Sequence, residues 1–525
     1  MICLIPYVPL LIFEISKANK AILLFSLSLG KTVQVSDNLS TAYQHLKTQD
    51  NLPRHKLYSI FGLSNINQMD INHIKQVHFI AIGGSVMHNL ALALHKRNIK
   101  VTGSDDEIYE PAAGKLKSAG LNPSIGWDVN QIKQELDAVI LGMHAKEDNP
   151  ELKKAQELGL PIFSFPEFVR ELSANKQRIV VGGSHGKSTI TAMIMHVLKS
   201  AGKSFDYLVG AELEGFDLTV QISDAPIIII EGDEYLASKL DTQPKFLKYD
   251  HHIGVISGIK WDHKNVFPTF EEYTKQFDLF ADKTPKAGSL IYCEEDNLAN
   301  IVGAKDREDV RKLPYGTHDA EINNGTTYLK TKDHGKVKIN VFGKHNLQNI
   351  KAAQEVCNIL GITDDKFYDA IASFKGAKNR LELLAENGGI KVFKDYAHAP
   401  SKLKATVNAL HHQYSPEKIC IAYELHTFSS LDKEFIQEYK DTLKNADAAL
   451  IYINPKNLKI EGESALNEND VKKAFNKTDI EFFDNENDLK EALISQKGKV
   501  KTFAFLSSGH FGDLNLSETA QTLVQ

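Results

Sequence analysis

The chain has 525 residues, too many for one hydrophobic core of ordinary size, so we expect two to four domains. Hydrophobic residues make up 42% and charged residues 24% of it, the balance of a globular protein. The net charge of −6 argues against a surface that coats nucleic acid, because such surfaces are basic. Four widely separated cysteines favour isolated reduced thiols over a disulfide framework or a zinc site: Cys3, Cys293, Cys357 and Cys420.

The N-terminal stretch is apolar, but neither of its two apolar runs reaches the roughly 20 residues that a membrane-spanning helix needs. Two prolines and Glu14 interrupt the first run, Lys17 and Lys20 separate it from the second, and the basic start of a signal peptide is lacking. Clear periodicity begins only near Val77. We therefore expect an N-terminal extension over residues 1–70 and a natural start at Met69, so that residues 1–68 would not belong to the native protein. We expect no stable insertion into a membrane.

Residues 71–174 are expected to form a first domain, because they alternate between strand-like and helix-like patterns. An apolar run at 77–82 ends at Gly83 and Gly84. The next apolar residues recur on one helical face, at Met87, Leu90, Ala91 and Leu94. Further strands are predicted at 99–105, 137–145 and 160–165, which gives a domain built from βαβ units.

A second domain is expected over residues 175–375, where a strand at 178–181 runs into GGSHGKST. Glycines let backbone N–H groups approach an anion, and the helix N-terminus adds partial positive charge. Lys187 is expected to reach nucleotide phosphates, and Ser188 to ligate Mg²⁺. Val181 stands where the common pattern has glycine, so a plain glycine-rich turn that caps a helix stays open as the alternative. The predicted phosphate loop comprises Gly183, Ser184, His185, Gly186, Lys187, Ser188 and Thr189.

Acidic residues follow two further strands of this domain. Four consecutive isoleucines predict a strand buried on both faces of a parallel sheet, and Glu231, Asp233 and Glu234 come after it. A carboxylate at this point can hold the metal that bridges phosphate oxygens. Asp262 and His263 follow the apolar run at 252–259, and His263 is a second candidate ligand. An acidic loop in solvent and a structural histidine are the respective alternatives.

A third domain is expected over residues 376–525, because strand-like and helix-like patterns alternate there once more. The predicted strands lie at 390–395, 418–423, 448–453 and 501–506. The fold class is therefore α/β with three domains. A Rossmann-like domain comes first, a P-loop ATPase domain lies in the centre, and a Rossmann-like domain follows.

Six motifs, in one order along residues 77–525, resemble those of the Mur ligases of peptidoglycan synthesis. They are GSHGKST at 183–189, EGDE at 231–234, the pair Asp262–His263, GKHNLQN at 343–349, NRLE at 379–382 and KDYAHAP at 394–400. The resemblance implies a cytoplasmic, ATP- and Mg²⁺-dependent ligase with small-molecule substrates. In that family, a UDP-muramyl carboxylate attacks the γ-phosphate of ATP, and an amine then displaces phosphate from the acyl phosphate.

The resemblance also implies roles for individual residues. Lys187, His263 and Arg380 would be catalytic, and Ser188, Glu231 and His263 would hold Mg²⁺. The phosphate loop would be completed by His345, Asn346, Asn349, Arg380 and Asp395, although Asn346 also suits a helix cap.

The first domain would bind the UDP-muramyl group, and the third domain the incoming amine. The UDP-muramyl site would comprise Gly83, Gly84, Ser85, Met87, Asp105 and His144, although an acid at 105 also suits the ribose of NAD. The peptide site would comprise His398, His426, Ser429, His510 and Asp513.

Two branches of the family differ in the amine that they use. One adds L-alanine to UDP-N-acetylmuramate in de novo synthesis. The other adds L-Ala-γ-D-Glu-meso-diaminopimelate during peptidoglycan recycling. The segments 102–116 and 246–267 resemble the second branch, so the tripeptide is the expected amine and L-alanine the alternative.

The chain departs from the family at several positions, and rival classes exist. Gly232, Asn379 and Ala399 replace common residues, and Phe277 stands where some relatives carry a carbamylated lysine, which we therefore do not expect. The rivals are a dehydrogenase, a switch protein that only hydrolyses ATP, and a folylpolyglutamate-type ligase. The sequence does not indicate an oligomeric state.

Overall fold

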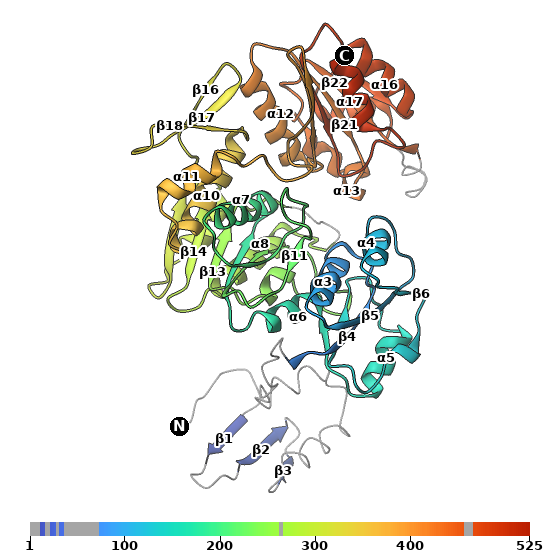
Figure 1. Ribbon diagram of the computed structural model, residues 1–525, viewed down its shortest axis with the longest axis vertical. Coiled ribbons are helices and arrows are strands. Elements are labelled where there is room, and N and C mark those ends of the chain that lie inside the picture. Colours follow the sequence, from blue (N-terminus) through green and yellow to red (C-terminus); the bar gives the residue numbers. More distant parts are fainter. Residues whose placement is uncertain (1–10, 16–20, 28–30, 36–72, 262–265, 456–465) are drawn as a thin grey trace. The chain divides into compact units, whose positions relative to one another are not determined.

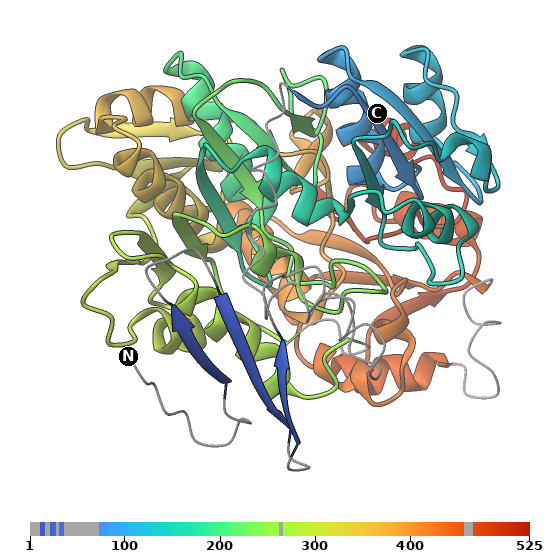
Figure 2. The same cartoon turned by 90° about the horizontal axis from the view of Figure 1, so that it is seen from below.

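The computed structural model describes residues 11–15, 21–27, 31–35, 73–261, 266–455 and 466–525. The chain divides into two compact units, Met1–Gln68 and Met69–Gln525. The smaller unit contains an antiparallel sheet of three strands, seen as dark-blue arrows in Figure 2. These strands are β1 (Leu11–Ile15), β2 (Ala21–Leu27) and β3 (Lys31–Val35).

The first sheet of the larger unit is a parallel sheet of five strands (Figure 1). Its central strand β4 (Gln76–Ile80) is buried at four of its five residues, as a strand covered on both faces requires. Helix α3 (Ser85–Lys96) follows the two glycines and buries the predicted apolar residues. The other strands are β6 (Ser124–Ile125), β5 (Lys100–Asp105), β7 (Ala138–Leu141) and β8 (Ile162–Ser164), in the order β6-β5-β4-β7-β8.

Three further helices and a 3-10 turn accompany this sheet. They are α4 (Ala112–Ser118), η2 (Val129–Gln131), α5 (Pro150–Glu157) and α6 (Phe165–Leu172). Asn149 accepts a hydrogen bond from the Leu152 N–H and so caps α5, while Ser164 and Glu167 form a capping box at α6.

The second sheet has seven strands, and all of its pairs are parallel except that of β10 with β11. Adjacent residues of β9 (Gln177–Gly182) face opposite layers. Val180 packs in the cluster that contains Phe246 and Phe277, whereas Val181 packs with residues of α7 and α10. The order is β11 (Val220–Gln221), β10 (Asp206–Leu208), β12 (Ile227–Glu231), β9, β13 (Ile253–Ile256), β14 (Ser289–Cys293) and β15 (Arg311–Tyr315).

Helices cover both faces of this sheet. On one face α7 (Lys187–Ser200) packs against α10 (Lys344–Ile359) and α11 (Asp364–Ile371). On the other lie η3 (Lys245–Lys248) and α8 (Phe270–Asp282), and α9 (Asn297–Gly303) packs beside β14.

Two more sheets complete the larger unit. One is antiparallel: β16 (Ala320–Asn323), β17 (Thr326–Lys330) and β18 (Lys336–Ile339). The other has six strands and is parallel except at β19: β19 (Glu382–Asn387), β20 (Ile390–Asp395), β24 (Thr502–Leu506), β21 (Ile419–Glu424), β22 (Ala448–Tyr452) and β23 (Ile480–Phe483). Together with the first two sheets, it confirms the predicted α/β fold class.

Helices flank the six-stranded sheet as well. In Figure 1, α12 (Pro400–Tyr414) lies on one side of its strands, and α16 (Glu486–Ser495) and α17 (Leu516–Val524) lie on the other. The shorter helices are α13 (Phe428–Leu431), η4 (Phe435–Tyr439) and α15 (Glu468–Phe475).

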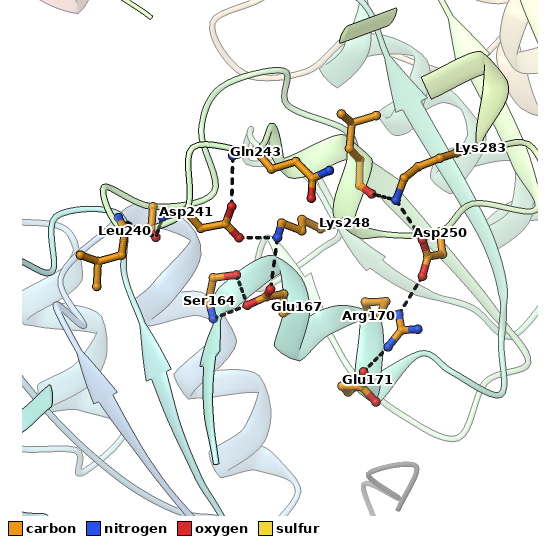
Figure 3. A network of polar contacts seen from close by, with 12 residues as sticks. Ser164, Glu167, Arg170, Glu171, Leu240, Asp241, Gln243, Lys248, Asp250 and Lys283 are labelled. Atoms are coloured by element: carbon orange, nitrogen blue, oxygen red, sulfur yellow. Dashed lines mark hydrogen bonds and ion pairs between the residues drawn. The ribbon is translucent and has the colours of Figure 1, made fainter. Parts of the chain in front are cut away.

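Charged pairs join α6 to the second sheet's loops (Figure 3). Lys248 contacts Glu167 at 3.2 Å and also pairs with Asp241. The guanidinium of Arg170 donates to Asp250 at 2.8 Å. Each exposed pair contributes little by itself, but the network fixes α6 at several points.

The structure bears on the expectations about cysteines and membrane helices only for the residues that it describes. Cys293, Cys357 and Cys420 are free, buried thiols, while Cys3 lies outside the described residues. Within the described parts of the chain, no helix is both long and apolar enough to cross a membrane.

Candidate active site

The loop between β9 and α7 has the backbone geometry of an anion cradle. Gly183 has φ 136° and Gly186 has φ 80°, backbone angles that residues other than glycine rarely adopt. A Cβ at 183 would collide with the Ser257 hydroxyl, and one at 186 would lie 2.5 Å from Asn349 Oδ1. Val181, the departure from the common pattern, is fully buried in β9 and belongs to the core rather than to the loop.

Lys187 begins helix α7, and its ammonium group is held at both sides. Its Nζ donates to Gly183 O and to Glu234 Oε2, each at 2.6 Å. Burial alone would lower the pKa of Lys187, but the carboxylate of Glu234 raises it above its ordinary value. The Tyr273 hydroxyl donates to Glu234 Oε1 at 3.1 Å. The lysine is therefore charged, and a phosphate group would have to displace Glu234.

Ser188 and Glu231 bring oxygen atoms together beside the lysine. Ser188 Oγ donates to Glu231 Oε1 at 2.7 Å, and Glu231 Oε2 accepts from the Gly210 N–H at 2.6 Å. Arg380 Nη2 lies 3.4 Å from Ser188 Oγ. Asp262 and His263 lie outside the described residues.

The segment around Arg380 leads from helix α11 into β19, the first strand of the six-stranded sheet. Asn379 and Leu381, on either side, both have positive φ, 58° and 49°. Asn tolerates this conformation better than most residues do. The Asp395 carboxylate accepts from the Leu381 N–H at 2.6 Å, and the Arg380 guanidinium lies 4.8 Å from the centre of the Tyr396 ring. Burial raises the pKa of Asp395 to about 6.

A cavity of about 980 Å³ joins these groups. Twelve of the predicted metal, nucleotide and peptide residues line it beside Lys187: Ser184, His185, Gly186, Ser188, Thr189, Glu231, His345, Asn346, Asn349, Arg380, Asp395 and His398. The lining residues come from the phosphate loop, the segments at the ends of β13 and β14, strands β16 and β17, α10, and the six-stranded sheet with α12. A nucleotide bound along the loop would therefore be enclosed by elements of three sheets.

The start of α10 differs from the expectation that Asn346 caps a helix. Gly343, with φ 88°, is the N-cap of α10, and Asn346 does not cap the helix as the alternative interpretation held. Instead the Asn346 amide donates to the main-chain oxygen of Phe342, the residue before the N-cap, at 2.9 Å. Burial lowers the pKa of both His185 and His345 to about 4, so both rings are neutral at physiological pH.

The residues predicted to bind the UDP-muramyl group meet at the end of β4. Asp105 Oδ2 accepts from the Gly83 N–H at 2.8 Å, and Gly84 is the N-cap of α3, directly before Ser85. Met87 is 3% exposed and packs in the core, and its Cγ would lie 3.6 Å from a Cβ placed on Gly84 at the turn. Burial raises the pKa of Asp105, and the nearby His144 opposes that shift.

The residues predicted to bind the peptide are divided between two places. His398 lies in the cavity, where its main-chain oxygen accepts from the hydroxyls of Tyr423 and Tyr439 at 2.8 and 2.7 Å. The others follow the neighbouring strands β21 and β24 and do not line the cavity: His426, Ser429, His510 and Asp513.

Sequence reasoning missed a buried acid at the end of β21. Glu424 is 1% exposed, and its Oε2 accepts from Ser507 Oγ at 2.5 Å and from the Phe511 N–H at 3.0 Å. Its other oxygen lies 3.8 Å from His426 Nδ1. The signal was available, because the acid ends a strongly apolar strand next to a predicted site residue.

A phosphate loop, a strand-end carboxylate and side chains that reach in from another sheet define a multidomain nucleotide-dependent enzyme. The chain matches the Mur ligase family, catalytic domain, over residues 76–177 and the Mur ligase middle domain over residues 181–357. A UDP-N-acetylmuramate–L-alanine ligase of Paenarthrobacter aurescens is 31% identical over 75% of this chain and 84% of its own length. The chain therefore belongs to the Mur ligase family, the ATP-dependent ligases that form C–N bonds.

Solved structures agree with the fold. UDP-N-acetylmuramate-alanine ligase of Thermotoga maritima has a TM-score of 0.63 at 20% identity, with 86% of this chain and 98% of the other covered. UDP-N-acetylmuramate:L-alanyl-γ-D-glutamyl-meso-diaminopimelate ligase of Neisseria meningitides has a TM-score of 0.52 at 25% identity, covering 57% and 98%.

Proposed function

We propose that this ligase joins the lactyl carboxylate of UDP-N-acetylmuramate to the amino group of L-alanine. One observation carries the choice of substrates. A relative of 31% identity, with 84% of its length matched, is a UDP-N-acetylmuramate–L-alanine ligase. The cavity supports the use of ATP, because it gathers the Lys187 ammonium, the Arg380 guanidinium and the phosphate loop. This proposal prefers L-alanine to the tripeptide, whereas the sequence motifs favoured the tripeptide.

The proposed chemistry begins with two anions, a carboxylate and a triphosphate. Lys187 and Arg380 would balance the charge on the transferred phosphoryl group, and the N–H groups of the loop would orient it. The carboxylate oxygen attacks phosphorus and ADP leaves. The amine nitrogen then attacks the acyl carbon, phosphate leaves, and the nitrogen loses a proton.

The donor set at Ser188 and Glu231 fits Mg²⁺, the cofactor expected with ATP. Both are hard oxygen ligands, 2.7 Å apart, and both line the cavity beside the phosphate loop. Mg²⁺ in nucleotide sites is held by one or two protein oxygens together with phosphates and water. When bound, it would neutralise charge on the phosphates. His263 remains a proposed third ligand and catalytic residue.

The three parallel-rich sheets suggest a division of labour. We assign the UDP-muramyl group to residues 71–174, ATP to residues 175–375 and the amine to residues 376–525. Residues 1–70 are proposed to be an extension outside the working enzyme. The proposed location is the cytoplasm, where ATP and the UDP-linked substrate are available.

The tripeptide L-Ala-γ-D-Glu-meso-diaminopimelate is the second candidate amine. It is supported by the Neisseria neighbour, which is 25% identical and 98% covered, and by the motif resemblance at 102–116. The recycling reaction would use the same carboxylate and the same ATP chemistry, so only the pocket for the amine distinguishes the two reactions.

The test measures phosphate release with ATP, Mg²⁺ and UDP-N-acetylmuramate while the amine is varied. We expect turnover with L-alanine and a product whose mass equals that of the amide. Turnover with the tripeptide alone would replace L-alanine by the second candidate. Phosphate release without any amide would contradict ligase activity with both.

A further inference from the structure

A loop of the second sheet contacts two segments outside that sheet, helix α4 beside the first sheet and the segment that leads into the six-stranded sheet. It runs from the end of β10 to the start of β11, and Glu212 lies in it. Glu212 Oε1 accepts from Lys115 Nζ at 2.8 Å, and Oε2 accepts from Lys378 Nζ at 2.7 Å. Its main-chain oxygen accepts from the Lys378 N–H at 3.2 Å. These two lysines lower the pKa of Glu212 to about 2, so the carboxylate is charged throughout the physiological range.

On one side, Glu212 contacts the first sheet through α4. Lys115 lies in this helix, which directly follows the loop from Asp105 to Pro111. That loop begins with the carboxylate that holds the Gly83 N–H, in the proposed UDP-muramyl site. A ligand that orders the loop would therefore also fix the start of α4.

On the other side, Glu212 contacts the segment that leads to Arg380. Lys378 is bound through both its side chain and its main chain, and Arg380 comes two residues later. Arg380 reaches Ser188 Oγ at 3.4 Å in the cavity. The placement of this guanidinium thus depends on a segment that Glu212 holds.

The same loop also contacts the metal-site acid. Gly210, two residues before Glu212, donates its N–H to Glu231 Oε2 at 2.6 Å. Farther along, Lys199 donates to Gly215 O at 2.5 Å and Phe216 packs against Tyr207. The loop is therefore anchored on both sides of Glu212, to strands β12 and β10 and to helix α7, and these contacts resist a displacement of Glu212.

We propose that Glu212 is a positioning residue that couples occupation of the UDP-muramyl site to the placement of Arg380 at the ATP site. It does so by holding Lys115 and Lys378 at once. The inference rests on the proposed function, since it takes UDP-N-acetylmuramate as the ligand of the first domain. Coupling between two sites is reciprocal, so each ligand should tighten the binding of the other.

The test is a calorimetric measurement of the Kd of a non-hydrolysable ATP analogue, with and without saturating UDP-N-acetylmuramate. In the wild type we expect the second ligand to lower that Kd by about five-fold or more. In Glu212→Gln the factor should fall below about two-fold, because the variant loses the link between Lys115 and Lys378.

The matched control is Glu214→Gln on the same loop. Glu214 also pairs with a lysine of the segment before Arg380, Lys375 at 3.0 Å, but both side chains are largely exposed, and among the described residues neither forms a hydrogen bond or ion pair with the first sheet. This variant should keep the wild-type factor. Lys115→Met should lose the factor as Glu212→Gln does, and the double variant should lose no more than either single variant.

The outcomes separate the two claims. If the wild type does not bind UDP-N-acetylmuramate, the proposed function fails and the coupling falls with it. If the wild type binds both ligands but shows no factor, or if Glu212→Gln retains it, the role of Glu212 is wrong and the proposed function stands. An equal loss in Glu214→Gln would mean a general effect of loop charge and would also overturn the role.

Discussion

At the scale of single residues, Lys187 has the most direct link to the chemistry. Its ammonium lies between a loop carbonyl and the buried carboxylate of Glu234, which keeps it charged at the mouth of the phosphate cradle. We expect Lys187→Ala to lower the turnover rate by at least about 10²–10³-fold, the typical cost of losing one preorganised donor. Steady-state phosphate release, with circular dichroism as the folding control, measures this. Wild-type turnover in the folded variant would reject the assignment.

Asp395 supports a prediction on pH at the same scale. Burial raises its pKa from 3.8 to about 6, so the folded protein binds this proton more tightly than the unfolded chain does. The contribution of Asp395 to stability is therefore full below pH 4 and is lost as the pH rises through 6, by roughly 3 kcal/mol. Urea unfolding from pH 4 to 7 should show this fall in the wild type. It should be absent from Asp395→Asn, and an unchanged pH slope in that variant would contradict the account.

At the scale of elements, helix α7 is bounded by two glycines with left-handed backbone. Gly186 has φ 80° and a neighbouring amide in the way of a Cβ, whereas Gly202 has φ 67° and open space around it. Alanine at either position should cost about 1 kcal/mol or more in the free energy of unfolding, because of backbone strain. Only Gly186→Ala should also weaken binding of an ATP analogue, by about ten-fold or more, since it closes the cradle. Titration calorimetry of both variants checks this, and equal binding by the two would contradict it.

The elements also show what the sequence can predict. The buried parallel strands stood out because apolar runs such as the four isoleucines of β12 are long and uninterrupted. The sheet β16–β18 was missed because its strands are short, largely polar and half exposed. The glycine-rich loop between β9 and α7 could be predicted because a turn that brings backbone N–H groups toward an anion needs glycines at fixed spacing. Glu212 could not, because its partner Lys378 lies 166 residues away and an exposed ion pair leaves no local pattern.

At the scale of the whole molecule, the division of the chain at Gln68 and Met69 bears on the N-terminal extension. If the second unit is the working enzyme, a chain that begins at Met69 should keep the turnover rate of the full chain within about two-fold. Its thermal unfolding midpoint should not fall. Parallel measurement of both chains decides this, and a loss of activity on truncation would show that the extension takes part in function.

The central claim for the whole molecule is that ATP activates a carboxylate and is not hydrolysed directly by water. The measurement that tests it most directly uses UDP-N-acetylmuramate labelled with ¹⁸O in the lactyl carboxylate, with ATP and L-alanine in ordinary water. An acyl phosphate carries one carboxylate oxygen into the leaving phosphate, so mass spectrometry should find ¹⁸O in the released phosphate. Unlabelled phosphate, released at the rate of ATP consumption, would show hydrolysis by water and would contradict the account.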